Sequence, residues 1–246
     1  MAPLKRFCLI GHPVAGSLSP SLMQAAYSGR YSYDLVDEDN FEAAWEHGVE
    51  YDAFNVTAPY KRDAFKSADF RDCDGIDACN LIMKADGGGF HAFNTDVDGV
   101  IGALDSLEAG PTALIVGTGG AAAAALAATR ELGLDAIVAG RDSQKASRLA
   151  STFPGCVSCG LDQLPTKDDI GLIIYTLPST APVPEGLPWE NAVVLEAEYK
   201  NPRLAGAPCL KYVSGKLWLL HQAVAGFRLM TGEEPSLPAM REVLGM

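Results

Sequence analysis

The stretch that decides the fold is Ala113-Leu-Ile-Val116, followed at once by Gly117-Thr-Gly-Gly-Ala-Ala122 and a helix-forming run to Leu132. An apolar strand that passes through G-x-G-x-x-A into a helix is typical of a Rossmann-type dinucleotide-binding turn. The alternative is a glycine-rich turn kept only for close packing. The strand–loop–helix context favours the dinucleotide site.

Each position of this loop has a predicted role. Gly117 permits the tight turn, Gly119 lets a pyrophosphate approach the backbone, and Ala122 keeps the helix close to the sheet. The helix starts at Gly120 and Ala121, where N–H groups and the helix dipole favour a phosphate.

The next strand, Ala136–Ala139, runs into Gly140-Arg-Asp-Ser-Gln-Lys145. Arg141 stands near the position where NAD-specific domains carry an acidic ribose ligand, and Lys145 follows four residues later. Because a guanidinium suits a phosphate, NADP is the predicted cofactor. Two alternatives stay open: Asp142 could accept a ribose hydroxyl, or Arg141 and Lys145 could be a solvated helix start.

Around this unit, β-rich runs alternate with helical runs, which favours an α/β fold with parallel sheets covered on both faces. The predicted strands are Arg6–Ile10, Tyr31–Val36, Ala53–Val56, Leu81–Met83, Gly89–Phe93, Ala113–Val116, Ala136–Ala139, Leu172–Tyr175, Ala192–Leu195 and Leu210–Val213. The predicted helices are Ser19–Tyr27, Phe41–His47, Thr95–Ser106, Gly120–Leu132, Ser143–Thr152 and Leu217–Thr231.

Two breaks, at Glu108–Pro111 and Val213–Gly215, predict two domains. Residues 1–97 are expected to bind the substrate. Residues 98–213 have the size of a doubly wound dinucleotide-binding domain. Residues 214–246 form a helix-rich tail.

Composition limits the partners. The 246 residues carry a formal charge of −12, which argues against nucleic acid or an anionic membrane surface. No apolar run reaches a membrane span, so the expected location is the cytoplasm. The six cysteines are expected to be reduced thiols, and no metal site is predicted. Cys156-Val-Ser-Cys159 has metal or redox spacing, but small buried residues near a strand are the preferred interpretation.

Two further strand ends carry residues suited to proton transfer. Ala53–Val56 leads through Thr57 to Lys61, and the run to Phe93 leads through Asn94 to Asp96. A lysine with a lowered pKa can take the proton of an alcohol that loses a hydride, while an aspartate orients it. Alone, Lys61 would be a surface lysine and Asp96 a helix cap.

A third candidate lies near the N-terminus, where Leu9-Ile10 leads into Gly11-His-Pro-Val-Ala-Gly-Ser-Leu-Ser-Pro20. Ser17 and Ser19 can offer hydroxyl and backbone N–H groups to a carboxylate at the start of a helix. Helix capping alone would also explain Ser19.

These motifs resemble those of the shikimate dehydrogenase family: S-L-S-P, N-V-T-x-P-x-K, N-T-D and G-x-G-G-A-A, in the family's order. The resemblance implies reversible NADP-dependent oxidation of shikimate to 3-dehydroshikimate, on the route to chorismate and aromatic amino acids. It also implies that residues 214–246 return to the first domain.

The resemblance assigns roles residue by residue. Lys61 and Asp96 match the catalytic pair, whose proton carrier stays open between them. The positions that match substrate-binding residues are Ser17 and Ser19 at the carboxylate, and Thr57, Asn80, Tyr199 and Gln222 elsewhere, with Asn94 supporting Asp96. The chain departs from the family pattern at Gly16, Gly140, Glu196 and Tyr175, and Tyr175 is expected to alter contacts near the nicotinamide.

Two alternatives of function stay open. One is a relative that acts on quinate or aminoshikimate, with NAD or NADP. The other is a non-catalytic dinucleotide or metabolite sensor, against which the retention of both Lys61 and Asp96 argues. The expected partner is a small polyhydroxy carboxylate, and the expected assembly is a monomer or a homodimer.

Overall fold

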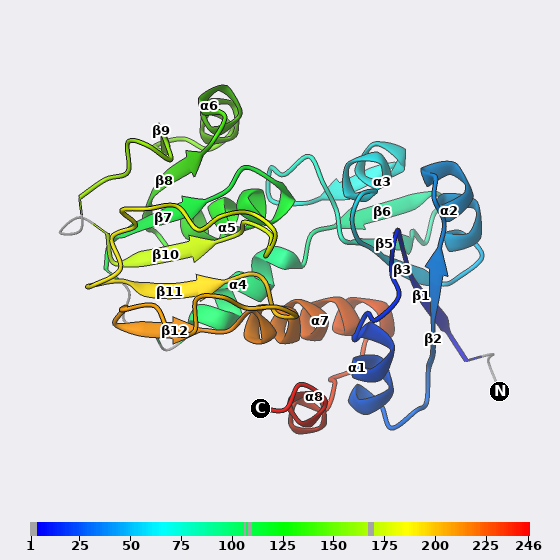
Figure 1. Ribbon diagram of the computed structural model, residues 1–246. Coiled ribbons are helices and arrows are strands. Elements are labelled where there is room, and N and C mark those ends of the chain that lie inside the picture. The colour runs from blue at the N-terminus through cyan, green and yellow to red at the C-terminus, as the bar shows by residue number, and fades with distance from the viewer. Residues whose placement is uncertain (1–3, 106, 108–109, 167–169) are drawn as a thin grey trace. The chain divides into compact units, whose positions relative to one another are not determined.

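A computed structural model describes residues 4–105, 107, 110–166 and 170–246 of the chain (Figure 1). The chain forms two compact units: residues up to Thr95 together with Gln222–Met246, and residues Asp96–His221. The predicted helix end at Ser106 and part of the break at Glu108–Pro111 lie outside the described residues.

The first unit is built on a six-stranded sheet of order β2-β1-β3-β5-β6-β4. Its strands are β1 (Arg6–Gly11), β2 (Ser32–Asp37), β3 (Ala53–Val56), β4 (Phe70–Asp72), β5 (Leu81–Lys84) and β6 (Phe90–Phe93). Its helices are α1 (Ser19–Ala26), α2 (Phe41–Gly48), α3 (Lys61–Ser67), α8 (Leu237–Val243) and the part of α7 (Gly215–Thr231) from Gln222 onward.

The prediction of a wholly parallel sheet is wrong for this unit. β5 pairs antiparallel with β3 and with β6, whereas the other pairs are parallel. The reason is a tight turn between β5 and β6, in which Gly88 and Gly89 adopt positive φ angles of 93° and 83°. A turn this short can join only antiparallel neighbours.

Helices cover both faces of this sheet. On one face, Ala44 of α2 and Ala64 of α3 pack into a buried cluster with Ile10, Phe54 and Ile82. On the other face, Phe227 of α7 meets the ring of Tyr33, with 6.1 Å between ring centroids. Sequence patterns missed α3, α8 and β4, which have only seven, seven and three residues.

The second unit holds a six-stranded parallel sheet of order β12-β11-β10-β7-β8-β9. Its strands are β7 (Thr112–Val116), β8 (Asp135–Gly140), β9 (Val157–Gly160), β10 (Leu172–Tyr175), β11 (Val193–Glu196) and β12 (Lys211–Val213). Its helices are α4 (Asp96–Leu104), α5 (Gly120–Glu131), α6 (Ser143–Ser151) and the start of α7. The strand order reverses between β7 and β10, and such a switch point is where doubly wound sheets bind ligands.

Burial explains why this sheet is so regular. All residues of β10 and β11 are buried, as expected for parallel strands covered on both faces. The alanines of α5, fully buried from Ala122 to Ala128 except Ala123, let this helix lie close to the sheet, behind which it runs in Figure 1. The predicted α/β class is confirmed. Among the described residues, no helix has the length and apolar character that crossing a membrane requires.

Candidate functional site

The two serines near the N-terminus lie where β1 passes into α1. Ser17 Oγ donates to Ser19 Oγ at 3.2 Å, and the Ser19 N–H donates to Ser17 Oγ at 3.3 Å. The N-cap of α1 is Leu18, and no described side chain caps this helix. Capping therefore does not account for Ser19, which is the first residue of the helix. The two hydroxyls form a pair of donors suited to a carboxylate.

Asp37, at the end of β2, holds the loop that precedes the serines. Its carboxylate accepts hydrogen bonds from His12 Nδ1 at 2.7 Å and from the Val14 N–H at 3.1 Å. The Val14 and His12 hydrogen bonds, in that order, hold the pKa of Asp37 below its usual value. Sequence reasoning missed Asp37. Its signal was an acidic residue at the carboxyl end of the strand beside β1.

Gly16 lies in the same loop, with φ at +79°. A Cβ added at this position would have no atom of the described chain within 4 Å. Backbone conformation, not lack of space, is therefore what favours glycine here.

A second set of polar side chains lies on β3, the β5 entry and α7. The buried Asn80 accepts from the Thr95 N–H at 2.8 Å and donates from Nδ2 to Gln222 Oε1 at 3.3 Å. Asn55 Nδ2 donates to the Asn80 carbonyl at 2.9 Å, and Tyr33 Oη donates to Asn55 Oδ1 at 2.7 Å. Asn80 and Gln222, 142 residues apart in the chain, are thus brought together as predicted residues of one site.

Thr57 and Lys61 lie on the connection from β3 to α3. The Thr57 N–H donates to the Ile10 carbonyl at 3.0 Å, which ties this segment to β1. Lys61 is the first residue of α3 and partly buried, and its carbonyl accepts from the Cys79 N–H at 3.0 Å. Lys61 is therefore not a fully exposed surface lysine.

The N-T-D segment follows β6. Asn94 is buried and donates from Nδ2 to the Ala78 carbonyl at 2.9 Å, so its side chain supports the segment before Asn80. Thr95, also buried, is held by Asn80. Asp96 comes next and is the first residue of α4, in the second unit.

In the second unit, the glycine-rich loop has the geometry that a pyrophosphate requires. Gly117 has φ at +130°, and a Cβ there would collide with Thr176 Oγ1. Gly119 is the N-cap of α5, and the described residues offer no side-chain cap and no atom within 4 Å of a Cβ at Gly119 or Gly120. The helix N-terminus at Gly120 and Ala121 is therefore approachable by an anion.

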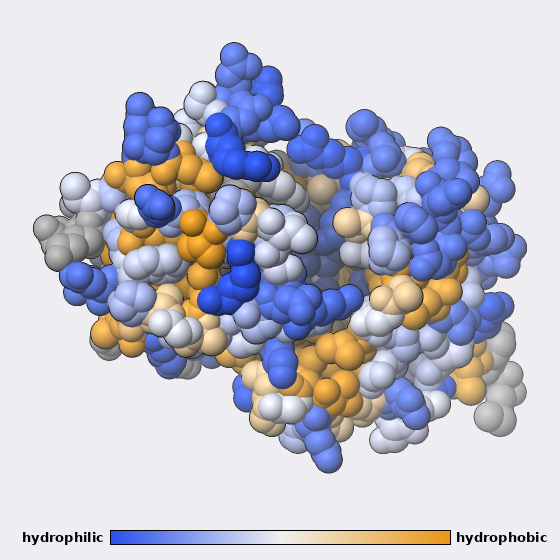
Figure 2. Space-filling view, in the orientation of Figure 1, coloured by the Kyte–Doolittle hydropathy of each residue, from blue (hydrophilic) through white to orange (hydrophobic). Residues whose placement is uncertain are grey.

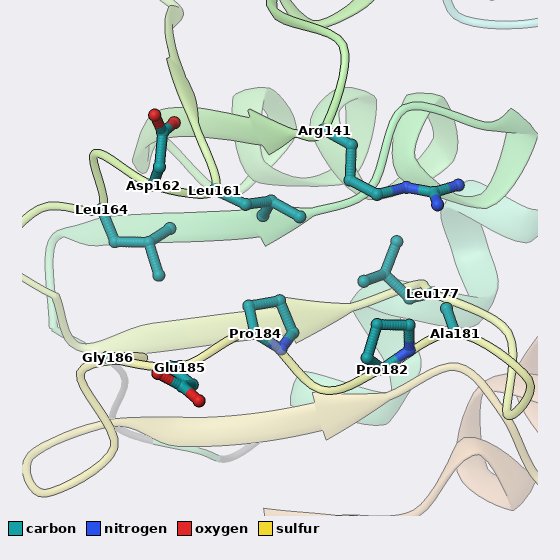
Figure 3. Close-up of a pocket in the computed structure, with 10 residues that line it drawn as sticks. All are labelled: Arg141, Leu161, Asp162, Leu164, Leu177, Ala181, Pro182, Pro184, Glu185 and Gly186. Carbon is teal, nitrogen blue, oxygen red and sulfur yellow. The ribbon is translucent and has the colours of Figure 1, made fainter.

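Arg141, at the end of β8, lines a groove of about 790 Å³. Figure 3 shows its side chain extended along the groove, with Leu177 pointing toward it. The other lining residues are Leu161, Asp162, Leu164, Ala181, Pro182, Pro184, Glu185 and Gly186. Figure 2 shows hydrophobic atoms, in orange, exposed over β7 and β10 on this face of the second unit. An apolar groove with a guanidinium at its end suits a base and a phosphate.

Asp142 has a structural role that the sequence patterns did not reveal. It is the N-cap of α6, and Oδ1 accepts from the N–H groups of Gln144 at 3.0 Å and Lys145 at 3.1 Å. Lys145 Nζ lies 4.0 Å from Asp142 Oδ2. Asp142 is thus occupied as a helix cap, whereas Arg141 reaches the groove.

Comparison with known proteins identifies the family. The family model of the shikimate dehydrogenase substrate binding domain matches residues 9–82, and that of the shikimate 5'-dehydrogenase C-terminal domain matches residues 219–244. A shikimate dehydrogenase (NADP(+)) of Haloarcula marismortui is 33% identical, over 94% of this chain and 95% of its own. The chain belongs to the shikimate dehydrogenase family.

Relatives from other organisms agree. A shikimate dehydrogenase (NADP(+)) of Thermus thermophilus is 31% identical over 96% of both chains. The crystal structure of a Thermus thermophilus shikimate 5-dehydrogenase in complex with NADP(H) and shikimate superposes with a TM-score of 0.85. It is 30% identical and covers 98% of this chain and 99% of its own.

The departures from the family pattern can now be placed. The expectation that Tyr175 alters contacts near the nicotinamide stays a prediction. Tyr175 is fully buried in the core of the second unit, and its hydroxyl accepts from Arg203 Nη2 at 3.3 Å. Burial is also the main cause that raises its pKa. Gly140 lies against Thr118, whose Cγ2 would be 2.6 Å from a Cβ, so the family's asparagine would not fit here without a shift.

Glu196 is the carboxylate that replaces the family's aspartate. It is buried and accepts from the N–H groups of Arg203 at 2.9 Å and Leu204 at 3.1 Å, and from Tyr212 Oη at 2.8 Å. It therefore fixes the loop after β11, which carries the partly buried Tyr199. Tyr199 belongs to the second unit, whereas the other predicted substrate residues belong to the first.

All six cysteines are free thiols. Cys156 and Cys159 are only partly buried, so the prediction of buried residues is wrong for them, because β9 is an edge strand. Burial nevertheless raises the pKa of Cys156 to about 11. The described residues contain no group of His, Cys, Asp or Glu side chains that could hold a metal ion.

Proposed function

We propose that this chain catalyses the NADP-dependent interconversion of shikimate and 3-dehydroshikimate, a step toward chorismate and the aromatic amino acids. The observation that carries the proposal is the presence of two hydrogen-bonded sets in the first unit: the Ser17–Ser19 pair and a polar row made of Tyr33, Asn55, Asn80 and Gln222. The serines offer donors for a carboxylate, and the polar row offers Asn80 and Gln222 for hydroxyl groups. The relatives' names support the same substrate and cofactor.

Substrate binding falls to the first unit in this proposal. Ser17 and Ser19 take the carboxylate, while Thr57, Asn80 and Gln222 take the hydroxyl groups. The buried hydrogen bonds of Asn80 support this division, because they fix its amide before a ligand arrives. Tyr199 is proposed as a further contact from the loop after β11.

The second unit takes NADP, and its residues fit that cofactor. Gly117, Gly119, Gly120 and Ala121 would hold the pyrophosphate at the start of α5, where space is open. Arg141 would hold the phosphate on the ribose, with Lys145 as a second cation. The engagement of Asp142 as a cap supports NADP over NAD, since an acidic ribose ligand is the mark of NAD sites.

A nicotinamide held in the second unit would supply the hydride chemistry, and the residues of this chain would move the proton. Lys61 and Asp96 act at the alcohol oxygen, one as the base that takes its proton and the other as the group that orients it. The Lys61 carbonyl is tied to Cys79, next to Asn80, and Asn80 also holds Thr95, next to Asp96. Both hydrogen bonds lie within the first unit, and they fix the backbone at Lys61 and at the residue before Asp96. The proposal includes a cytoplasmic location and a monomer or homodimer.

The test follows reduced-nicotinamide absorbance with shikimate and quinate, each paired with NADP and with NAD. Shikimate turnover mainly with NADP is the expected result. Quinate turnover with NAD would move the chain to a sister enzyme, and no turnover in any pairing would favour a sensor. A parallel preparation of Lys61→Ala guards against a contaminating host enzyme.

A further inference from the structure

The loop after β10 forms part of the wall of the groove that Arg141 lines. Leu177 and Ala181 of this loop are among the lining residues, and Figure 3 shows Leu177 pointing toward Arg141. Pro178 lies between them, and its carbonyl accepts two hydrogen bonds, from the Ala181 N–H at 2.9 Å and from Arg203 Nη2 at 3.5 Å. A side chain from another loop therefore reaches the turn that carries this wall.

The backbone of Arg203 is itself held in place. Arg203 lies in the loop after β11, where its N–H donates to Glu196 Oε1 at 2.9 Å. The other oxygen of this buried carboxylate accepts from the Leu204 N–H at 3.1 Å and from Tyr212 Oη at 2.8 Å. Both oxygens of Glu196 thus fix the backbone from which the Arg203 side chain starts.

Tyr175 orients the guanidinium of Arg203. The Tyr175 hydroxyl accepts from Arg203 Nη2 at 3.3 Å, and Tyr175 lies directly opposite Glu196 in the register of β10 and β11. Nη2 carries two N–H groups, one for the Tyr175 hydroxyl and one for the Pro178 carbonyl. Tyr175 and Glu196 both depart from the family pattern, and both contact this one arginine.

We propose that Arg203 is a positioning residue for the cofactor, which acts by fixing the Pro178 turn and so the groove wall on either side of it. This inference rests on the proposed function, in which NADP occupies the groove. The start of the loop is fixed without Arg203, because Thr176 Oγ1 donates to the Val116 carbonyl at 2.9 Å. Arg203 holds the turn that follows, which lowers the cost of ordering the wall when the cofactor binds.

The test is Arg203→Met, which removes the guanidinium and keeps an unbranched side chain, with shikimate and NADP as substrates. The KM for NADP should rise by about fivefold, the effect of one ordinary hydrogen bond. The kcat should stay within about twofold, because the groove contributes equally to ground state and transition state. The KM for shikimate should not change, since the backbone N–H groups of Arg203 and Leu204 still bind Glu196.

Arg71→Met is the matched control. Arg71, in β4 of the first unit, also donates to backbone carbonyls, from Nε to Phe65 at 2.7 Å and from Nη2 to Lys66 at 2.9 Å. The same group is lost there from bonds outside the groove, so Tm should fall without a rise in the KM for NADP. A rise as large as that of Arg203→Met would mean that general loosening is enough, and would overturn the inference.

A double-mutant cycle with Tyr175→Phe asks whether Tyr175 acts through Arg203. Tyr175→Phe should raise the KM for NADP by about threefold alone, and by less than about 1.5-fold in the Arg203→Met background. Multiplied effects, or an unchanged KM in either single variant, would overturn the inference while leaving the proposed function intact. Calorimetric titration of NADP gives the same comparison without turnover, and Tyr175→Phe alone decides if Arg203→Met does not fold. A wild-type chain that neither binds NADP nor turns over shikimate would overturn both.

Discussion

The two sheets of this molecule differ in how many polar side chains their strands carry. In the second unit, β10 and β11 are buried along their whole length. Their only polar side-chain groups are the Glu196 carboxylate and the Tyr175 hydroxyl. In the first unit, Tyr33 of β2 and Asn55 of β3 bring polar side chains onto the sheet itself. The two units therefore differ in whether their candidate functional groups lie on the sheet or on the loops beyond it.

In the second unit, the candidate ligand residues lie on loops beyond the strands, as Gly119 and Arg141 do, and the sheet serves as a support. In the first unit, the candidate residues Asn80 and Gln222 are linked through Asn55 to Tyr33 on the sheet itself. A change in the loops should therefore affect one ligand, whereas a change in the polar row should spread along it. The following predictions test this contrast.

The largest effect is expected from Lys61→Ala. Loss of a general acid–base group should lower kcat by roughly two to four powers of ten, with little change in Tm. The control is Lys66→Ala on the same helix, a lysine whose side chain is 75% exposed. Steady-state kinetics of both variants measure the contrast, and near-normal turnover in Lys61→Ala would remove Lys61 from the mechanism.

Arg141→Gln should act on the cofactor alone. Because a hydrogen bond to a charged group contributes about 1.5–3 kcal/mol, the KM for NADP should rise by about 10- to 100-fold while that for NAD changes little. The control is Arg148→Gln. Arg148 is an exposed arginine in α6, the helix that follows Arg141. An equal loss with both cofactors would show that Arg141 does not contact the extra phosphate.

Two glycines of the same loop should separate stability from binding. Gly117→Ala places a Cβ at positive φ against Thr176, which should destabilise the fold by about 1–3 kcal/mol. Gly119→Ala meets open space at a φ of −92°, so Tm should stay while NADP binds more weakly. Thermal unfolding and NADP titration of both variants test this; the reverse pattern would contradict the loop assignment.

The smallest effect is expected at Asp37 and depends on pH. Its folded pKa is lowered, so its ionised form stabilises the fold. That contribution is complete above the ordinary aspartate pKa of about 4 and is lost as the pH falls through the lowered value. Asp37→Asn should therefore lower Tm at pH 7 and converge with the wild type below about pH 3. Asp86→Asn, in the exposed turn after β5, removes the same charge from the same unit and is the matched control.

Much of the second unit could be predicted, because its signals are local. Uniformly apolar strands and the loop from Gly117 to Ala122 are each contained in a short stretch of sequence. The placement of Tyr175 could not be predicted. The side chains of a strand alternate between the two faces of the sheet, and the sequence does not say which face meets the ligand. The Asp142 cap was visible in principle as an aspartate just before a helix.

The first unit shows where sequence reasoning ends. Tyr33 and Asn55 lie on strands that both pair with β1, opposite Phe7 and Leu9 respectively, so their bond passes over the strand between them. Neither residue has a sequence signature for that contact, which depends on strand order and register. The antiparallel β5 was missed for the same reason.

The most direct test of the division between the two units is calorimetric titration of shikimate and of NADP into the wild type, Ser19→Ala and Arg141→Gln. The account predicts that Ser19→Ala weakens shikimate binding and leaves NADP binding unchanged, while Arg141→Gln does the opposite. Equal weakening of both ligands in either variant, or no shikimate binding to the wild type, would contradict it.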